Sequence, residues 1–213
     1  MLMKLLCFAG LFAVAAAGSC PSSTLQLISK CYTPYLKFFG ASCTSKTLPS
    51  YTAWTIPREL MYQNGSSSVF PVCSVTKTLY ACLGNNAPLS LDCYQAMGLS
   101  AVEASVYRTD LSAMQFQCTA GVNALYSTFD CYRAASVTYN AAIQKCETDY
   151  AKNVQSDVCK AMNTMMDCKS SIYGKQCGTE AKSLNCGIVR TALNLLDGSC
   201  SASGKLNKCA ACH

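Results

Sequence analysis

Apolar residues recur at three- and four-residue steps through most of the chain after about residue 90. The repeat is clearest between residues 119 and 152, at Val122, Leu125, Tyr126, Phe129, Val137, Ala141 and Ile143. Because an α-helix completes one turn in about 3.6 residues, this spacing places the apolar side chains on one helical face. The alternation of apolar and polar residues that is typical of half-buried strands is scarce. The pattern therefore predicts an all-α protein.

Further helices are predicted on both sides of this region. A stretch rich in Ala and Ser predicts a helix over residues 100–117. The pair Ser156-Asp157 can cap a helix that contains three methionines, because side-chain oxygens at this position accept hydrogen bonds from the first backbone amides. Gly178 and Gly187 are expected to interrupt the helical pattern after it.

The first third of the chain is more interrupted. Ser22 or Ser23 is expected to cap a helix that Pro34 kinks or splits, because proline lacks the amide that a helix interior needs. Pro49 and Pro57 bracket a short aromatic segment. A further helix is predicted over residues 72–83, between loops at residues 64–68 and 84–88.

Residues 1–18 have the three parts of a secretory signal peptide. Lys4 supplies the positive start, residues 5–17 form an apolar run, and the alanines at its end offer a cleavage site. A transmembrane start would need about 20 apolar residues, and Ser19-Cys20-Pro21 ends the run earlier. No later apolar run comes near that length. We therefore expect a secreted, extracellular protein without a transmembrane segment, whose residues 19–213 form a cysteine-rich helical domain.

Cysteine is the most informative residue type in the chain. There are 17 cysteines, and an even sixteen remain when Cys7 of the signal peptide is removed. An exported chain with an even cysteine count is typically oxidised, so we expect all sixteen to form disulfides of unassigned pairing. They are Cys20, Cys31, Cys43, Cys73, Cys82, Cys93, Cys118, Cys131, Cys146, Cys159, Cys168, Cys177, Cys186, Cys200, Cys209 and Cys212.

Eight residues separate several neighbouring cysteines, for example Cys159 from Cys168 and Cys177 from Cys186. On a helix, nine steps of about 100° place two such thiols on opposite sides and ~13 Å apart along the axis. The Cα atoms of a disulfide lie only ~4.4–6.8 Å apart. Cysteines of one helix must then bond to different neighbours, which predicts a disulfide-stapled helical bundle or stack. A turn at Gly174 would instead allow a local bridge between Cys168 and Cys177.

One segment of the chain is echoed later in the sequence. Residues 72–82 and 158–168 share a valine, two cysteines, a threonine and two apolar positions at an offset of 86. An ancestral duplication would give two halves, at about residues 19–117 and 118–213. The alternative is a chance similarity between two amphipathic helices, and the sequence leaves both open.

The charges and the histidine content exclude several classes of function. The formal net charge of +6 comes from lysines and arginines that stand mostly singly, so no nucleic-acid or heparin patch is indicated. The single histidine is His213, and hydrolytic triads need an imidazole that the fold places. The acids Glu147 and Asp149 lie two residues apart, on different faces of a helix. We therefore expect a protein that is not an enzyme, with no catalytic residue and no cofactor.

Two short motifs have specific interpretations. Cys209-x-x-Cys212-His213 offers three zinc ligands where about four are needed, so two disulfides that anchor the tail are favoured and no metal is expected. Asn64-Gly65-Ser66 is an N-glycosylation sequon in a Gly- and Ser-rich loop. In an exported protein such a loop is accessible, and Asn64 is predicted to carry a glycan.

A set of cysteines with aromatic and leucine neighbours resembles a known family. The residues that carry the resemblance are Cys31, Tyr35, Leu36, Lys37, Phe39, Gly40, Cys73, Thr78, Leu79, Cys82, Leu83, Cys93, Phe116, Cys118, Cys131 and Cys146. In these residues the chain resembles the secreted cysteine-rich helical proteins of nematodes, and in particular the chondroitin proteoglycan 4 domain family. A sister family of exported nematode helical domains fits nearly as well. The resemblance implies an extracellular, all-α, disulfide-bonded domain without assigned enzymatic activity.

The sequence departs from this family at the glycosaminoglycan site. Chondroitin is added to serine in Ser-Gly dipeptides beside acidic residues. The Ser-Gly dipeptide of this chain is Ser203-Gly204, which Lys205 follows, and the nearest acid is Asp197. The resemblance therefore does not extend to a chondroitin chain on Ser203.

These observations favour a secreted, non-catalytic structural or interaction protein of the extracellular space or matrix. Its partner would be an extracellular protein or glycan. The alternative is an extracellular carrier of a small hydrophobic ligand or lipid, with the apolar stripe around Leu125 and Phe129 as its lining. A closed apolar cavity would favour the carrier, whereas a solid core with an exposed aromatic patch would favour the interaction protein.

Overall fold

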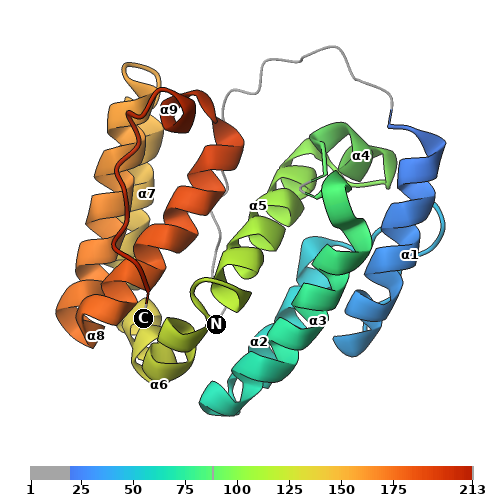
Figure 1. Ribbon diagram of the computed structural model, residues 1–213, viewed down its shortest axis with the longest axis horizontal. Coiled ribbons are helices and arrows are strands. Elements are labelled where there is room, and N and C mark those ends of the chain that lie inside the picture. Colours follow the sequence, from blue (N-terminus) through green and yellow to red (C-terminus); the bar gives the residue numbers. More distant parts are fainter. Residues whose placement is uncertain (1–19, 88, 213) are drawn as a thin grey trace. The chain divides into compact units, whose positions relative to one another are not determined.

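The computed structural model describes residues 20–87 and 89–212, and they fold into two compact helical units. The N-terminal unit comprises residues 20–64 and 70–115, and the C-terminal unit residues 65–69 and 116–212. Over these ranges the regular secondary structure is helical, which confirms the all-α class (Figure 1). The predicted signal peptide, residues 1–18, and His213 lie outside the described residues. The proposed duplication stays a prediction.

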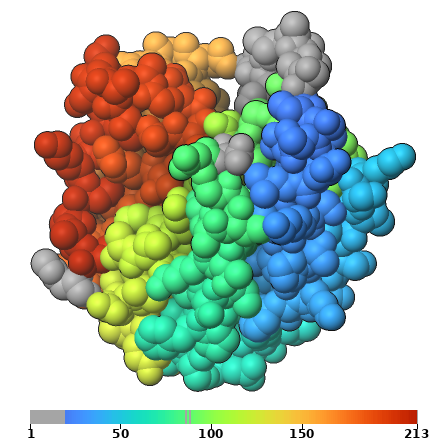
Figure 2. Space-filling view, turned by 45° about the vertical axis from the view of Figure 1, so that its right-hand side comes forward, coloured from blue at the N-terminus to red at the C-terminus, as the bar shows by residue number. Residues whose placement is uncertain are grey.

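Four helices and most of a fifth build the N-terminal unit. Its elements are α1 (Ser22–Phe38), α2 (Tyr51–Tyr62), α3 (Val69–Leu83), η2 (Gly84–Asn86), α4 (Leu91–Ala96) and α5 (Ala101–Cys118). The bridge Cys31–Cys82 joins α1 to α3, and these helices lie side by side in Figure 2, in blue and green. The bridge Cys20–Cys93 ties the start of α1 to α4.

The C-terminal unit is built around a helical hairpin. Its elements are η1 (Gly65–Ser68), α6 (Val122–Thr138), α7 (Asn140–Asn153), α8 (Val158–Leu196) and α9 (Ser199–Ala202). Gly178 has a φ of 85°, which only glycine adopts readily, and it divides α8 into two arms (Figure 1). The arms pack closely, because a Cβ atom at Gly174 would lie 2.9 Å from the Cβ atom of Lys182.

Four disulfides join the elements of the C-terminal unit. Their pairs are Cys131–Cys177, Cys146–Cys168, Cys159–Cys200 and Cys186–Cys209. Neighbouring cysteines of α8 therefore bond to different elements, which confirms the prediction from the eight-residue spacing. The alternative local bridge between Cys168 and Cys177 is wrong. The turn of α8 lies at Gly178, beyond both cysteines, and Gly174 is helical.

The expectation that all sixteen cysteines pair is wrong at two positions. Cys43 and Cys212 are free thiols, and both are partly exposed. The other fourteen, among them Cys73 and Cys118, are disulfide-bonded. Cys43 lies in the loop between α1 and α2, where its Sγ atom is 3.1 Å from Thr33 Oγ1. In the part of the chain that the structure describes, Cys43 and Cys212 are the two cysteines without a disulfide.

The predicted helix starts and breaks are confirmed in part. Asp157 caps α8, and its Oδ1 atom accepts a hydrogen bond from the Lys160 amide at 3.0 Å. At α1 the capping residue is Pro21, which makes no side-chain cap, so Ser22 and Ser23 are not the caps. Gly178 interrupts α8 as predicted, but Gly187 does not, since it lies buried inside the second arm.

Pro57 departs from its predicted role as a boundary. The structure places it inside α2, which continues to Tyr62. A proline in a helix interior forfeits one backbone hydrogen bond, but Trp54 and Arg58 on either side of it are buried. Burial of these two large side chains offsets the lost bond. Among the helices described, none is both long and apolar enough to span a membrane.

Candidate functional site

The N-terminal unit buries an ion pair in its core. The guanidinium of Arg58 on α2 donates from Nη1 to Asp110 Oδ2 at 2.8 Å and from Nη2 to Asp110 Oδ1 at 2.7 Å. Tyr51 donates a third hydrogen bond to Oδ1 at 2.8 Å. The side chains of Arg58 and Asp110 are only 6% and 3% exposed. Such a two-pronged, buried pair fixes α2 against α5 in one register.

Aromatic rings surround this ion pair. The Arg58 guanidinium lies 4.8 Å from the centre of the Trp54 ring, which favours the cation because the ring face is electron-rich. Trp54 Nε1 donates to Tyr107 Oη at 2.8 Å, and Tyr107 donates to the carbonyl of Pro49 at 2.7 Å. The indole of Trp54 and the hydroxyl of Tyr107 thus both meet a partner, as buried polar groups require, whereas Arg58 Nε is buried without one.

The environment of the cluster fixes its protonation. Burial alone would lower the pKa of Arg58, but the charge and hydrogen bonds of Asp110 outweigh it, so this pKa is raised well above its usual value. Burial, followed by the Asp110 charge, raises the pKa of Tyr51 well above 10. Both groups therefore keep their protons at neutral pH. The cluster holds the helices together, and its tyrosine is a poor general base or acid near pH 7.

The buried tyrosines should lose their protons at a higher pH than tyrosine in an unfolded chain. Burial is the first cause of a raised pKa in Tyr32, Tyr35, Tyr51, Tyr80, Tyr94, Tyr107, Tyr132, Tyr150 and Tyr173. For Tyr80 and Tyr132 the raised pKa is about 12. In an unfolded chain tyrosine ionises near pH ~10. The stability contributed by each buried, protonated tyrosine is thus fully present below pH ~10. It is lost as the pH rises through the higher pKa that the tyrosine has in the folded protein.

An alkaline titration tests this. We expect most of the tyrosinate absorbance of the native protein to appear well above pH ~10, together with the loss of helical circular dichroism. The same chain in denaturant should titrate near pH ~10 and serves as the control. Tyrosinate that appeared in full near that pH, with the helical signal unchanged, would contradict the burial of these rings.

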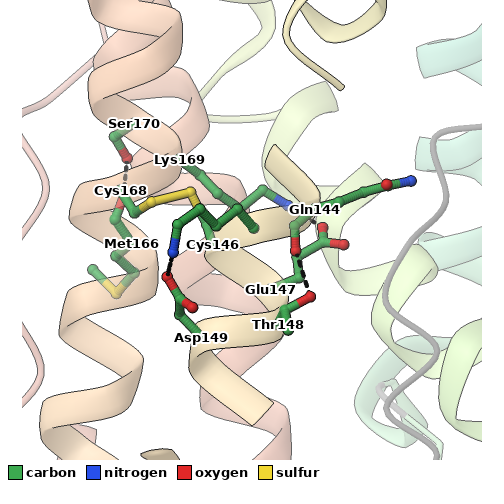
Figure 3. The surroundings of a disulfide bond; sticks show 10 residues. Gln144, Cys146, Glu147, Thr148, Asp149, Met166, Cys168, Lys169 and Ser170 are labelled. Atoms are coloured by element: carbon green, nitrogen blue, oxygen red, sulfur yellow. Dashed lines mark hydrogen bonds and ion pairs between the residues drawn. A yellow bond between two sulfur atoms is a disulfide. The ribbon is translucent and has the colours of Figure 1, made fainter. Parts of the chain in front are cut away.

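A second polar group lies where α7 meets the first arm of α8. Beside the bridge Cys146–Cys168, Lys169 donates to Glu147 Oε1 at 2.9 Å, and both side chains are 15% exposed (Figure 3). Asp149 instead pairs with Lys145 on its own helix at 2.6 Å. Glu147 and Asp149 thus engage different partners, as expected for residues on different faces, and they do not form a carboxylate pair.

A cavity of about 220 Å³ opens between the end of α7 and the start of α8. Its lining residues are Asp149, Tyr150, Asn153, Ser156, Asp157, Lys160, Ala161 and Thr164. Most of these side chains are polar or charged. Asp157 is already used as the cap of α8. Its volume lies below the ~300–1,000 Å³ typical of ligand pockets, and most of its lining residues are polar or charged, which does not favour a carrier of hydrophobic ligands.

The two cysteines of the Cys209-x-x-Cys212 motif differ in their bonding state. Cys209 is bridged to Cys186, so it has no thiolate to offer, while Cys212 is a free thiol. Among the residues that the structure describes, no group of three or more His, Cys, Asp or Glu side chains is placed to hold a metal. The prediction of two tail-anchoring disulfides is thus correct for Cys209 and wrong for Cys212.

The remaining candidate positions lie on the surface or in the core. Asn64 is exposed in the turn between α2 and η1, which leaves its glycosylation as a prediction, and Ser203 is exposed after α9. Of the apolar stripe on α6, Leu125 and Phe129 are 5% and 4% exposed, whereas Tyr126 is 45% exposed. The stripe therefore contributes two core residues and one surface aromatic.

The ion pair of Arg58 and Asp110 was not found from the sequence. The two residues are 52 positions apart, and neither stands in a motif. The available signal was indirect, namely an arginine, with Glu59 beside it, inside the segment that contains Tyr51, Trp54 and Tyr62. A charge that is buried among large aromatic residues needs a partner, because an unpaired charge in a core is costly.

Comparison of the sequence with protein-family models, with curated proteins and with solved structures gave no match. The disulfide-rich all-α architecture is the class that the fold defines.

Proposed function

We propose that this protein is a secreted structural or interaction module of the extracellular space, and that it is not an enzyme. The observation that carries the proposal is the density of cross-links in each unit. Two bridges tie the N-terminal helices, and four tie the elements of the C-terminal unit. Disulfides of this number persist in oxidising compartments and are rare in reducing ones.

The candidate chemistry also supports a non-catalytic role. The ion pair of the N-terminal unit is engaged in three hydrogen bonds and lies away from solvent. Each bridge that closes a loop of tens of residues stabilises the fold by about 2–4 kcal/mol. A cross-linked fold of this kind presents a fixed surface, which lowers the entropic cost of binding a partner. The partner is proposed to be an extracellular protein or glycan.

Expression of the full chain in a eukaryotic secretory host tests export and function together. We expect the mature protein in the medium, with its N-terminus near Ser19, because residues 1–18 match a signal peptide. A matched variant without residues 1–18 should stay inside the cell and carry reduced cysteines. An Asn64→Gln variant should lose the mass of one glycan. Full-length protein that remained in the cytosol would contradict export.

Organic extraction and mass spectrometry of the purified protein then separate the module from the carrier. We expect no lipid at a stoichiometric ratio, because the cavity of about 220 Å³ is small for a ligand pocket and most of its lining residues are polar or charged. One lipid molecule per chain, retained through gel filtration, would contradict the proposed interaction module and support a carrier of hydrophobic ligands.

A further inference from the structure

The last ten described residues form a strap along α8. After α9, residues 203–212 contain no helix or strand (Figure 1). Asn163 on the first arm of α8 holds the middle of this segment, donating from Nδ2 to the Lys205 carbonyl and accepting from the Asn207 amide, both at 2.8 Å. Leu206 between them is 4% exposed. We call residues 203–212 the C-terminal strap.

The second arm of α8 holds the strap at two further points. Arg190 Nε donates to the Asn207 carbonyl at 3.2 Å. The disulfide Cys186–Cys209 then fixes the strap covalently, two residues beyond Asn207. Residues 209–212 lie in no helix or strand. The bridge is the covalent attachment of the strap to the helix.

Cys212 places a free thiol three residues beyond this bridge. We propose that the C-terminal strap is a thiol–disulfide switch in which Cys212 displaces Cys186 from Cys209. The thiolate of Cys212 attacks the Sγ atom of Cys209, a Cys209–Cys212 bond forms as the Cys186–Cys209 bond breaks, and the Cys186 sulfur leaves as a thiolate that takes up a proton. One disulfide and one thiol are present before and after the step, so no external oxidant or reductant is needed.

The spacing of the two cysteines permits the new bond. In a turn, Cα atoms three residues apart lie within ~7 Å of each other, which overlaps the ~4.4–6.8 Å range of disulfides. Because residues 207–212 belong to no helix or strand, no hydrogen-bonded ladder opposes such a turn. The other free thiol in the described part of the chain is Cys43, and it belongs to the N-terminal unit.

The surroundings of the thiol set the resting state. Burial, and secondarily the charge of Glu180, raises the pKa of Cys212 above its usual value. Since the thiolate is the attacking species, exchange is slow near neutral pH. The hydrogen bonds of Asn163 and the burial of Leu206 further favour the strapped form. Exchange removes the covalent attachment at Cys186, so the two forms are a bistable element of the C-terminal unit.

Tryptic mapping after alkylation distinguishes the two forms directly. Cleavage at lysine and arginine places Cys186 in the peptide 183–190 and both tail cysteines in the peptide 209–213. In the strapped form these peptides are joined, and N-ethylmaleimide labels Cys212. In the exchanged form the peptide 209–213 carries an internal disulfide, and the label is on Cys186. The full chain is incubated at mildly alkaline pH without reductant before N-ethylmaleimide is added.

We expect label on Cys186 to increase with incubation time, by roughly tenfold over the same protein alkylated at once. A Cys212→Ser variant should keep the joined peptides and leave Cys186 unlabelled at all times, while a Cys43→Ser variant should exchange like the wild type. Amide hydrogen exchange at Leu206 and Asn207 should rise in the exchanged form only.

Three results would overturn the switch. In the first, Cys186 stays unlabelled at all times while Cys212 is labelled quantitatively. Another is a peptide that joins Cys43 to Cys212, since no attacking thiol then remains. The third is label on Cys186 in the Cys212→Ser variant, which would show that another thiol opens the bridge.

Discussion

An Asp110→Ala variant is expected to lose about 3–5 kcal/mol of stability in the N-terminal unit. The substitution leaves the guanidinium of Arg58 charged and buried, with its two strongest hydrogen bonds gone. It also removes the acceptor of the Tyr51 hydroxyl. The chain has one tryptophan, Trp54, and the Arg58 guanidinium lies 4.8 Å from its ring. Fluorescence during urea unfolding therefore reports on this unit, and its midpoint should fall.

Two further variants separate the loss of the pair from the loss of packing. The double variant Arg58→Met with Asp110→Leu should recover most of the stability, because no unpaired charge remains in the core. Lys145→Met is the matched control, since its partner Asp149 is 40% exposed and such pairs contribute at most about 1 kcal/mol. An Asp110→Ala midpoint close to that of the control would show that the pair is not buried in solution.

A Gly187→Ala variant is expected to destabilise the C-terminal unit. A Cβ atom at Gly187 would lie 2.7 Å from Phe116 Cε2 and closer still to two other atoms of that ring. Overpacking of this kind costs about 1–3 kcal/mol. Alanine inside a helix otherwise gains about 1 kcal/mol over glycine, so a net loss means that the contact with Phe116 dominates. Hydrogen exchange of the second arm of α8 measures the effect.

Whether Gly187→Ala lowers or raises the stability of the C-terminal unit should depend on the ring of Phe116. In a Phe116→Ala background the ring is gone, and Gly187→Ala should then stabilise the helix by about 1 kcal/mol. Gly198→Ala is the matched control, because its Cβ atom would meet only Asn194 O at 3.6 Å and its φ of −70° suits alanine. A destabilising Gly187→Ala in the background without the ring would disprove the packing of Phe116 on this glycine.

Local patterns predicted the parts of this protein that depend on neighbouring residues. Helical spacing gave the all-α class. A cap of α8 was correctly predicted at Ser156-Asp157, because a cap acceptor and the amide that it binds are only three residues apart, as Asp157 and Lys160 are. The eight-residue spacing correctly excluded a bond between Cys159 and Cys168, since helix geometry alone separates them. Gly178 ended an arm as predicted because its conformation is a property of the residue itself.

Contacts between distant segments decided the rest. The sequence showed no reason for Pro57 to lie inside α2 or for Gly187 to be helical, because burial of Trp54 and the ring of Phe116 set those outcomes. The pairing of Arg58 with Asp110 joins residues that no local pattern relates.

The cysteines show the same division. The sequence by itself determined that oxidation was to be expected and that one helix could not bridge to itself. Only the tertiary structure decided which cysteines pair and that Cys43 and Cys212 stay free. The physical reason is that a disulfide requires two Cα atoms within ~7 Å. That distance is fixed by how whole helices pack, and the spacing along one helix contains no information about its neighbours.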